Sequence, residues 1–154
     1  MLLPAEAVAA TALIEVIRLN APPARPGRPF TGDPVGHWAE AEAESALSLI
    51  ASLPGSVQHR CGFHPGWALR AYEATLSFAL FEAQFCFSCH EVRLHGPDAP
   101  PALSRQFFDP NSPQAQSLLT RLRAASPAAP SRPAAPSTPA APSTPAAPSS
   151  PAGV

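Results

Sequence analysis

The chain of 154 residues contains no lysine, so arginine supplies all 10 of its basic side chains, which 11 acidic side chains balance. The resulting net charge of −1 is spread along the sequence without a block of either sign. Proteins that bind nucleic acid normally carry a basic patch that contacts the phosphates. The sequence therefore gives no reason to expect a nucleic-acid partner. The short acidic run Glu40, Glu42 and Glu44 alternates with alanine and is typical of a solvated helix face.

Long hydrophobic runs are also missing. The apolar residues between Leu2 and Ile17 are interrupted by Glu6 and Glu15, and no basic residue precedes them. This pattern fits neither a secretory signal nor a membrane span. Cysteine is scarce, and an odd count of three argues against a closed disulfide framework. We therefore expect a cytoplasmic protein with reduced thiols and no membrane partner.

Proline is abundant, and its distribution divides the chain. From Pro127 to Pro151 it recurs at every third position among alanine, serine and threonine, which is the period of a polyproline II helix. A segment without large apolar residues cannot bury enough surface to order itself. We expect a disordered tail over residues 125–154 that serves as a spacer, as a ligand for a proline-binding groove or, in an exported chain, as a glycosylated stalk. A second Pro/Gly-rich stretch predicts a connector over 21–35. It separates an N-terminal segment, residues 1–20, in which 4–19 are predicted to form a helix, from a domain over 36–124.

Hydrophobic periodicity within that domain predicts both helices and strands. Residues 36–53 have the spacing of an amphipathic helix that ends at Pro54-Gly55, and a Leu-rich helix follows Pro113. Between Trp67 and Leu94 the pattern alternates as in strands, and its parity changes after Cys89, which indicates a tight turn. The connections are too short for parallel crossovers. We predict an α+β fold, in which a small three-stranded antiparallel meander packs against two or three helices.

The cysteines are the main candidates for chemistry, since the sequence shows no nucleophile elbow, phosphate loop or paired acid and base. Their spacing is C-x2-H followed, after twenty-one residues, by C-x2-C. Two close pairs of soft ligands are typical of tetrahedral zinc, because one turn can present both members of a pair to one ion. The predicted ligands are Cys61, Cys86 and Cys89, with His64 or His90 as the fourth; His59 is a further candidate.

Three other interpretations of the cysteines stay open. Cysteine in an aromatic strand is often an inert, buried apolar residue, and this is the reading we favour. Cys86 and Cys89 could instead form a thiol redox pair, although the strand-like sequence after them lacks the helix N-terminus that usually activates such a pair. With His90 they also match the C-x-x-C-H motif of haem attachment, for which the chain shows no export signal. The expected cofactor is therefore none, or zinc.

Several short motifs carry a resemblance to other proteins. They are Cys61-Gly62-Phe63-His64-Pro65, Ala68-Leu69-Arg70, Phe85-Cys86-Phe87-Ser88-Cys89, Val92-Arg93-Leu94 and Phe107-Phe108-Asp109. Over about residues 45 to 123 the chain resembles a group of small uncharacterised bacterial proteins that share a C-x-F-x-P turn and an F-C-F-x-C strand motif. The resemblance implies no activity. We expect a non-enzymatic binding or structural domain with a buried or zinc-holding cysteine cluster and a protein partner; the alternative is a thiol-based redox protein.

Overall fold

The computed structural model describes residues 1–20, 30–58, 61–75 and 78–125. Its strands are β1 (Leu13–Leu19), β2 (Gly32–Ala39), β3 (Trp67–Tyr72), β4 (Ala79–Cys86), β5 (Glu91–His95) and β6 (Arg105–Phe107). Its helices are α1 (Ala5–Ala10), α2 (Ala41–Ala51) and α3 (Pro113–Ala125), with a 3₁₀ turn, η1, at Pro101–Leu103. No helix in the described ranges has the length and apolar character needed to cross a membrane.

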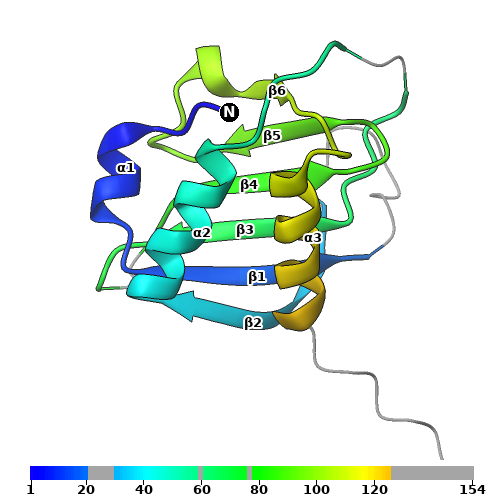
Figure 1. Cartoon of the computed structure of the whole chain (residues 1–154). Helices are drawn as coiled ribbons and strands as arrows, with labels where there is room; N and C mark the ends of the chain where they lie inside the picture. Colours follow the sequence, from blue (N-terminus) through cyan, green and yellow to red (C-terminus); the bar gives the residue numbers. More distant parts are fainter. Residues whose placement is uncertain (21–29, 59–60, 76–77, 126–154) are drawn as a thin grey trace, which may run out of the picture.

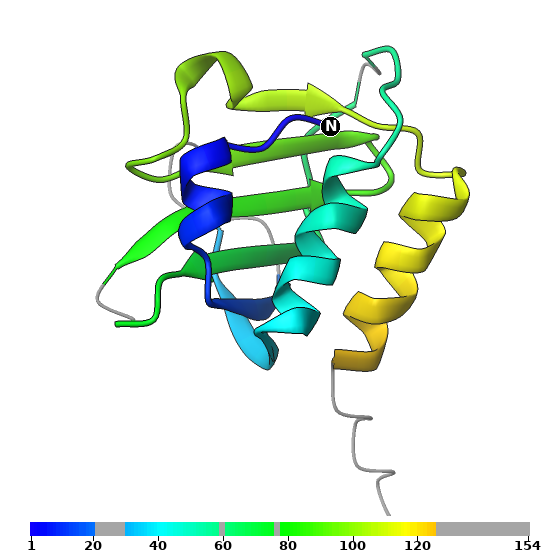
Figure 2. The ribbon, with the colours of Figure 1, turned by 60° about the vertical axis from the view of Figure 1, so that its left-hand side comes forward.

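The strands form one antiparallel sheet in the order β2-β1-β3-β4-β5-β6. Figures 1 and 2 show α1, α2 and α3 over the same face of this sheet. The α+β class is as expected, but the predicted three-stranded meander is wrong, because the sheet has six strands. The alternation of apolar and polar residues between positions 67 and 95 corresponds to β3, β4 and β5. Strands β1 and β2 extend the sheet beyond β3, and β6 extends it beyond β5.

The largest correction concerns the N-terminal segment, where a helix was predicted over residues 4–19. The helix α1 ends at Ala10, and residues 13–19 form β1 between β2 and β3. Ile14, Val16 and Ile17 are β-branched and fully buried, and such side chains favour a pleated strand. Alanine content favoured a helix, but burial on both faces of the sheet decides the outcome. Residues 13–19 are therefore part of the main sheet.

The predicted connector at 21–35 and the predicted helix at 36–53 are also revised. Gly32–Ala39 forms the edge strand β2, so the helix begins only at Ala41. Proline is tolerated at a sheet edge, where its missing N–H costs no ladder bond. The pairing of β2 with β1 is irregular beside Pro34, since Val16 faces Gly36 while the next residue, Ile17, faces Pro34. Residues 21–29 lie outside the described part of the chain.

The C-terminal part of the domain follows the sequence pattern closely. Helix α3 begins at Pro113, and Ser112 Oγ accepts a hydrogen bond from the backbone N–H of Ala115 at 3.2 Å, which caps the first turn. Leu118 and Leu122 are fully buried against the sheet side of the molecule. The helix ends at Ala125, and the predicted tail beyond it lies outside the described residues.

The two faces of the sheet differ in character. The face under the helices is apolar and contains Phe81, Ala83 and Phe85. Ala83 pairs with Leu94 on β5, and Phe85 pairs with Val92. The opposite face carries Glu15, Arg70 and Glu82 side by side on β1, β3 and β4. Phe63 and Phe30 lie over one end of this second face, where Phe30 packs against buried Ile17 and Leu19.

Candidate functional site

The turn between β4 and β5 holds two of the three cysteines. Cys86 is the last residue of β4 and pairs with Glu91, so residues 87–90 close the hairpin. His90 adopts a φ of 59°, a left-handed conformation that lets the chain reverse within so few residues. The backbone N–H of Cys89 donates to Cys86 Sγ at 3.2 Å. The change of parity predicted after Cys89 is therefore confirmed as a tight turn.

A loop from distant sequence, residues 61–66, packs against this turn. The Cys89 thiol donates to the backbone oxygen of Gly62 at 2.7 Å. Gly66 is fixed between two strands, because its N–H donates to the Phe85 oxygen and its oxygen accepts from Leu19. The ring of Phe63 lies 4.0 Å from the guanidinium carbon of Arg93, which holds the middle of the loop on the open face of the sheet.

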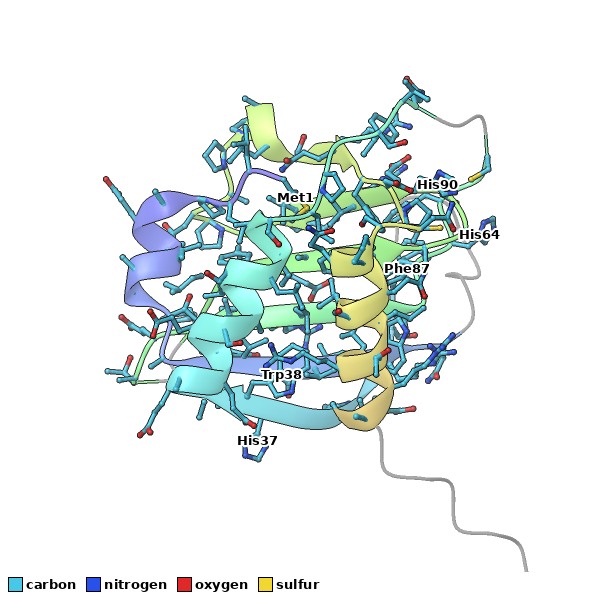
Figure 3. All side chains as sticks on the ribbon, in the orientation of Figure 1. Met1, His37, Trp38, His64, Phe87 and His90 are labelled. Atoms are coloured by element: carbon cyan, nitrogen blue, oxygen red, sulfur yellow. The ribbon has the colours of Figure 1, made fainter. Side chains whose placement is uncertain are left out.

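The predicted metal ligands lie in this region but are differently exposed. Cys86 and Cys89 are 0% and 2% exposed, whereas Cys61 and His64 are exposed. The Nδ1 atom of His64 lies 2.9 Å from the same Gly62 oxygen that the Cys89 thiol contacts. Figure 3 shows His64, Phe87 and His90 at the end of the sheet where β4 meets β5. In the described ranges, no three His, Cys, Asp or Glu side chains surround a common point where a metal ion could be held. His59 lies outside those ranges.

The thiol of Cys86 is buried, and its surroundings favour the protonated form. Burial raises its pKa above the ordinary value, and a hydrogen bond with Cys89 adds to the rise. The Ser88 hydroxyl and the backbone N–H groups of His64 and Cys89 act in the opposite direction but do not outweigh burial. Reactive redox thiols are accessible and readily ionised, whereas the Cys86 thiol is buried and has a raised pKa.

The charged side chains on the open face of the sheet neutralise one another. Arg70 contacts Glu82 and Glu15, and Tyr72 donates to Glu15 Oε2 at 3.2 Å.

Glu91 forms a second ionic cluster on this face. It is 1% exposed and accepts hydrogen bonds from Arg93 and Arg105 at 2.7 and 2.8 Å. Burial would raise the pKa of Glu91, but the bonds from Arg105 and Arg93 outweigh it and hold the pKa below the ordinary value. In both clusters, each carboxylate has a cationic partner.

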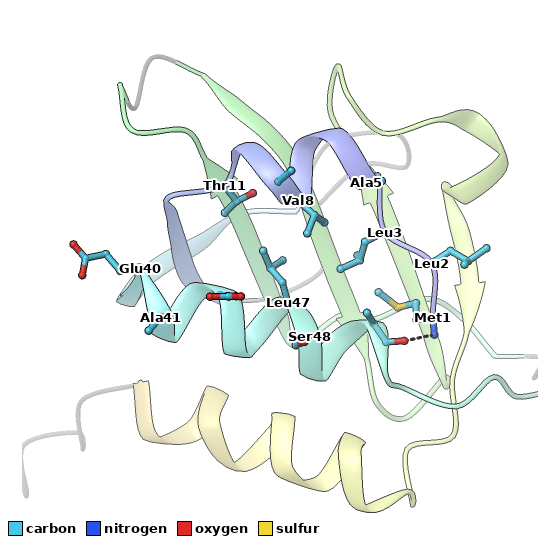
Figure 4. A pocket seen from close by; sticks show the side chains of 13 residues that line it. Met1, Leu2, Leu3, Ala5, Val8, Thr11, Glu40, Ala41, Leu47 and Ser48 are labelled. Carbon is cyan, nitrogen blue, oxygen red and sulfur yellow. Dashed lines mark hydrogen bonds between the residues drawn. The ribbon is translucent and has the colours of Figure 1, made fainter.

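A groove between α1 and α2 is a feature that sequence reasoning missed. It has a volume of about 860 Å³ and runs along both helices and the residues before α1. Figure 4 shows Leu3 and Val8 on one wall facing Leu47 on the other, while the nitrogen of Met1 donates to the Ala51 oxygen at 3.0 Å. Four of the nine remaining lining residues are alanine, which gives little periodic signal in a sequence. They are Ala5, Ala9, Ala41 and Ala51, with Leu2, Thr11, Glu40, Glu44 and Ser48.

The groove carries negative charge at one end. Glu40 and Glu44 are its only ionisable side chains, and within the described part of the chain neither forms an ion pair. Glu40 has a φ of 50° at the junction of β2 and α2, an uncommon conformation for a residue with a side chain. At the opposite end of the groove, beside Met1, Leu2 is 66% exposed. The acidic run of the sequence thus borders an apolar surface, and Figure 4 shows the Glu40 side chain pointing outward at its rim.

Comparison of the chain with models of protein families, with curated proteins and with solved structures finds no match.

Proposed function

We propose that this chain is a non-enzymatic binding domain that holds a basic amphipathic helix of a protein partner in the α1–α2 groove. The observation that carries the proposal is the combination of an open apolar groove with two carboxylates, Glu40 and Glu44, that have no cationic partner in the described residues. Apolar side chains of the partner would fill the space between Leu3, Val8 and Leu47. Its basic side chains would meet the carboxylates at the rim.

The shape of the groove supports a helical occupant. The eleven residues of α2 form a wall of about 16 Å, or three helical turns. A helix presents apolar residues at intervals of three and four along one face, and this is how amphipathic helices bind in grooves. The small side chains of Ala5, Ala9 and Ala41 leave room for a close approach of the partner backbone.

The non-enzymatic character rests on the state of the reactive groups. Apart from Glu40 and Glu44, the side chains that line the described groove include no carboxylate, histidine or cysteine. Elsewhere in the described structure, Arg70, Glu82 and Glu91 are held in ion pairs, and the Cys86 thiol is buried with a raised pKa. These features favour binding over the redox alternative.

The proposal is tested with a synthetic amphipathic helix of about four turns, which has leucines on one face and arginines beside them. Calorimetry should show binding of this peptide and much weaker binding of a matched peptide with glutamate for arginine. Exposed ion pairs contribute about 0.2–1 kcal/mol each, so the double variant Glu40→Gln/Glu44→Gln should bind about two- to thirtyfold more weakly. The control is Glu42→Gln, which removes the same charge from α2 outside the groove.

A second pair of variants tests whether the peptide binds in the α1–α2 groove. Ala9→Trp fills the groove from α1 and should abolish binding, whereas Ala10→Trp, an exposed neighbour outside the lining, should not. Equal affinity for the arginine and glutamate peptides, or unchanged affinity in Ala9→Trp, would refute the proposal.

A further inference from the structure

Two arginines lie directly opposite each other on the open face of the sheet. Arg93 on β5 and Arg105 on the edge strand β6 are register partners, and their side chains are 39% and 44% exposed. Like charges in this position normally destabilise a sheet, and a single carboxylate, that of Glu91, contacts both of them. The three side chains therefore keep one positive charge. We propose that Arg93 and Arg105 bind the phosphate group of a phosphate monoester.

Glu91 fixes the position of both guanidinium groups. It is 1% exposed, and its two carboxylate oxygens accept hydrogen bonds from Arg93 Nε at 2.7 Å and from Arg105 Nη2 at 2.8 Å. Each guanidinium also lies over an aromatic ring. The guanidinium carbon of Arg93 is 4.0 Å from the centre of the Phe63 ring, and that of Arg105 is 4.9 Å from the centre of the Phe107 ring. Both groups are thus held in place before a ligand arrives, which reduces the entropy lost on binding.

The guanidinium nitrogens that do not contact Glu91 are available to a ligand. Within the described ranges, Nη1 and Nη2 of Arg93 and Nε and Nη1 of Arg105 donate no hydrogen bond. Side chains opposite each other on neighbouring antiparallel strands have their Cβ atoms about 4.5–5.5 Å apart, so one small anion can contact both arginines. A guanidinium presents its N–H groups in a planar fork that matches pairs of phosphate oxygens.

The charge and shape of the site favour a phosphate monoester over a carboxylate. At neutral pH such a monoester carries a charge of about −1.5 to −2 and three acceptor oxygens, and their tetrahedral arrangement lets it accept from two guanidinium groups at once. A carboxylate has two oxygens in one plane, which a single fork already satisfies. Glu82 on the neighbouring strand β4 is no competitor, because it already accepts hydrogen bonds from Arg70 and Gln84.

The arginine pair is separate from the α1–α2 groove. Val92 and Leu94, the neighbours of Arg93 along β5, belong to the apolar core under the helices, so Arg93 points to the other face of the sheet. Figures 1 and 2 show α1 and α2 over the apolar face. A phosphate held by the arginine pair therefore leaves the groove open, and the two proposals can fail separately.

The experiment titrates the isotope-labelled full chain with phenyl phosphate at constant ionic strength and follows the arginine Nε–H resonances by nuclear magnetic resonance. Saturable shifts are expected at Arg93 and Arg105 and not at Arg123, an exposed arginine of α3 without an ion pair in the described structure. Acetate, which has one oxygen fewer, should bind about tenfold more weakly or worse. O-Phosphoserine and glycerol phosphate distinguish a phosphorylated side chain from a polyol phosphate, and tighter binding of either supports the proposal.

Two variants test the arginines directly. Arg93→Gln and Arg105→Gln should each weaken the binding of phenyl phosphate by about tenfold or more, because hydrogen bonds to a charged group are lost. Arg123→Gln removes the same charge elsewhere and is the control. The wild-type shifts test the proposal even where a substitution beside buried Glu91 prevents folding. Absence of saturable shifts at both arginines, equal affinity for acetate, or unchanged affinity in the folded variants would overturn the proposal.

Discussion

Tyr72 gives the most direct view of the electrostatics of the sheet at the scale of a single residue. It is the only tyrosine in the chain, so the tyrosinate absorbance reports the ionisation of this one side chain. Burial raises the pKa of Tyr72 above 10.0, the charge and hydrogen bond of Glu15 raise it further, and Arg70 opposes them. The phenol therefore favours its neutral form in the folded protein.

Absorbance at alkaline pH tests whether burial and Glu15 raise the pKa of Tyr72. The tyrosinate signal of the folded chain should have its midpoint above that of the unfolded chain, and Glu15→Gln should lower the midpoint. Because the folded pKa is the higher one, the contribution of Tyr72 to stability is complete below its unfolded pKa and is lost as the pH rises through its folded pKa. Glu73→Gln, which removes the carboxylate next to Tyr72 in sequence, is the control. A folded midpoint at or below the unfolded one would contradict this account.

At the scale of elements, the sequence predicted those parts of the fold whose pattern is local. Strands β3, β4 and β5 alternate clearly, and α3 has a capping serine, an early proline and a leucine stripe. The strand β1 was hidden because Ala5–Ala10 is helical and its alanines extend the helical signal. The strand β2 was hidden because Gly32, Pro34 and Gly36 are typical of a connector, and only their place at a sheet edge makes them compatible with a strand.

The cap of α3 provides a test at this scale. Ser112→Ala removes the hydroxyl that accepts the Ala115 N–H, which should reduce the free energy of unfolding by about 1 kcal/mol. Ser117→Ala, in the same helix but exposed, should change it by less than about 0.5 kcal/mol. Urea denaturation of the two variants and the wild type measures the difference. Equal stability of both variants would show that the cap is not formed.

For the molecule as a whole, the sequence predicted the region of the sulfur atoms but not the groove. Two cysteine-containing motifs separated by a strand were enough to bring Cys61, His64, Cys86 and Cys89 into one region. Which of these side chains are buried depends on the packing of Phe63 and Gly66, which spacing does not reveal. The groove depends on the angle between α1 and α2, and it could not be predicted while residues 4–19 were assigned to one helix.

The contribution of the C-terminal segment is tested by truncation. Residues 126–154 contain no large apolar side chain except Val154, so their removal should leave the melting temperature and the affinity for the arginine peptide almost unchanged. Truncation after Thr120 removes Leu122, which is fully buried, and should cost about 2–5 kcal/mol. Calorimetry compares the two. A large loss of stability on removal of residues 126–154 alone would show that the tail packs on the domain.

The binding proposal predicts that the peptide contacts the α1–α2 groove and no other surface of the described structure. Nuclear magnetic resonance of the isotope-labelled full chain, titrated with the arginine-bearing peptide, measures this directly. Saturable shifts should be confined to the groove, with the methyl groups of Leu3, Val8 and Leu47 among the most affected. Shifts that centre on the open face of the sheet, or no shifts at concentrations where the peptide is folded, would contradict the account.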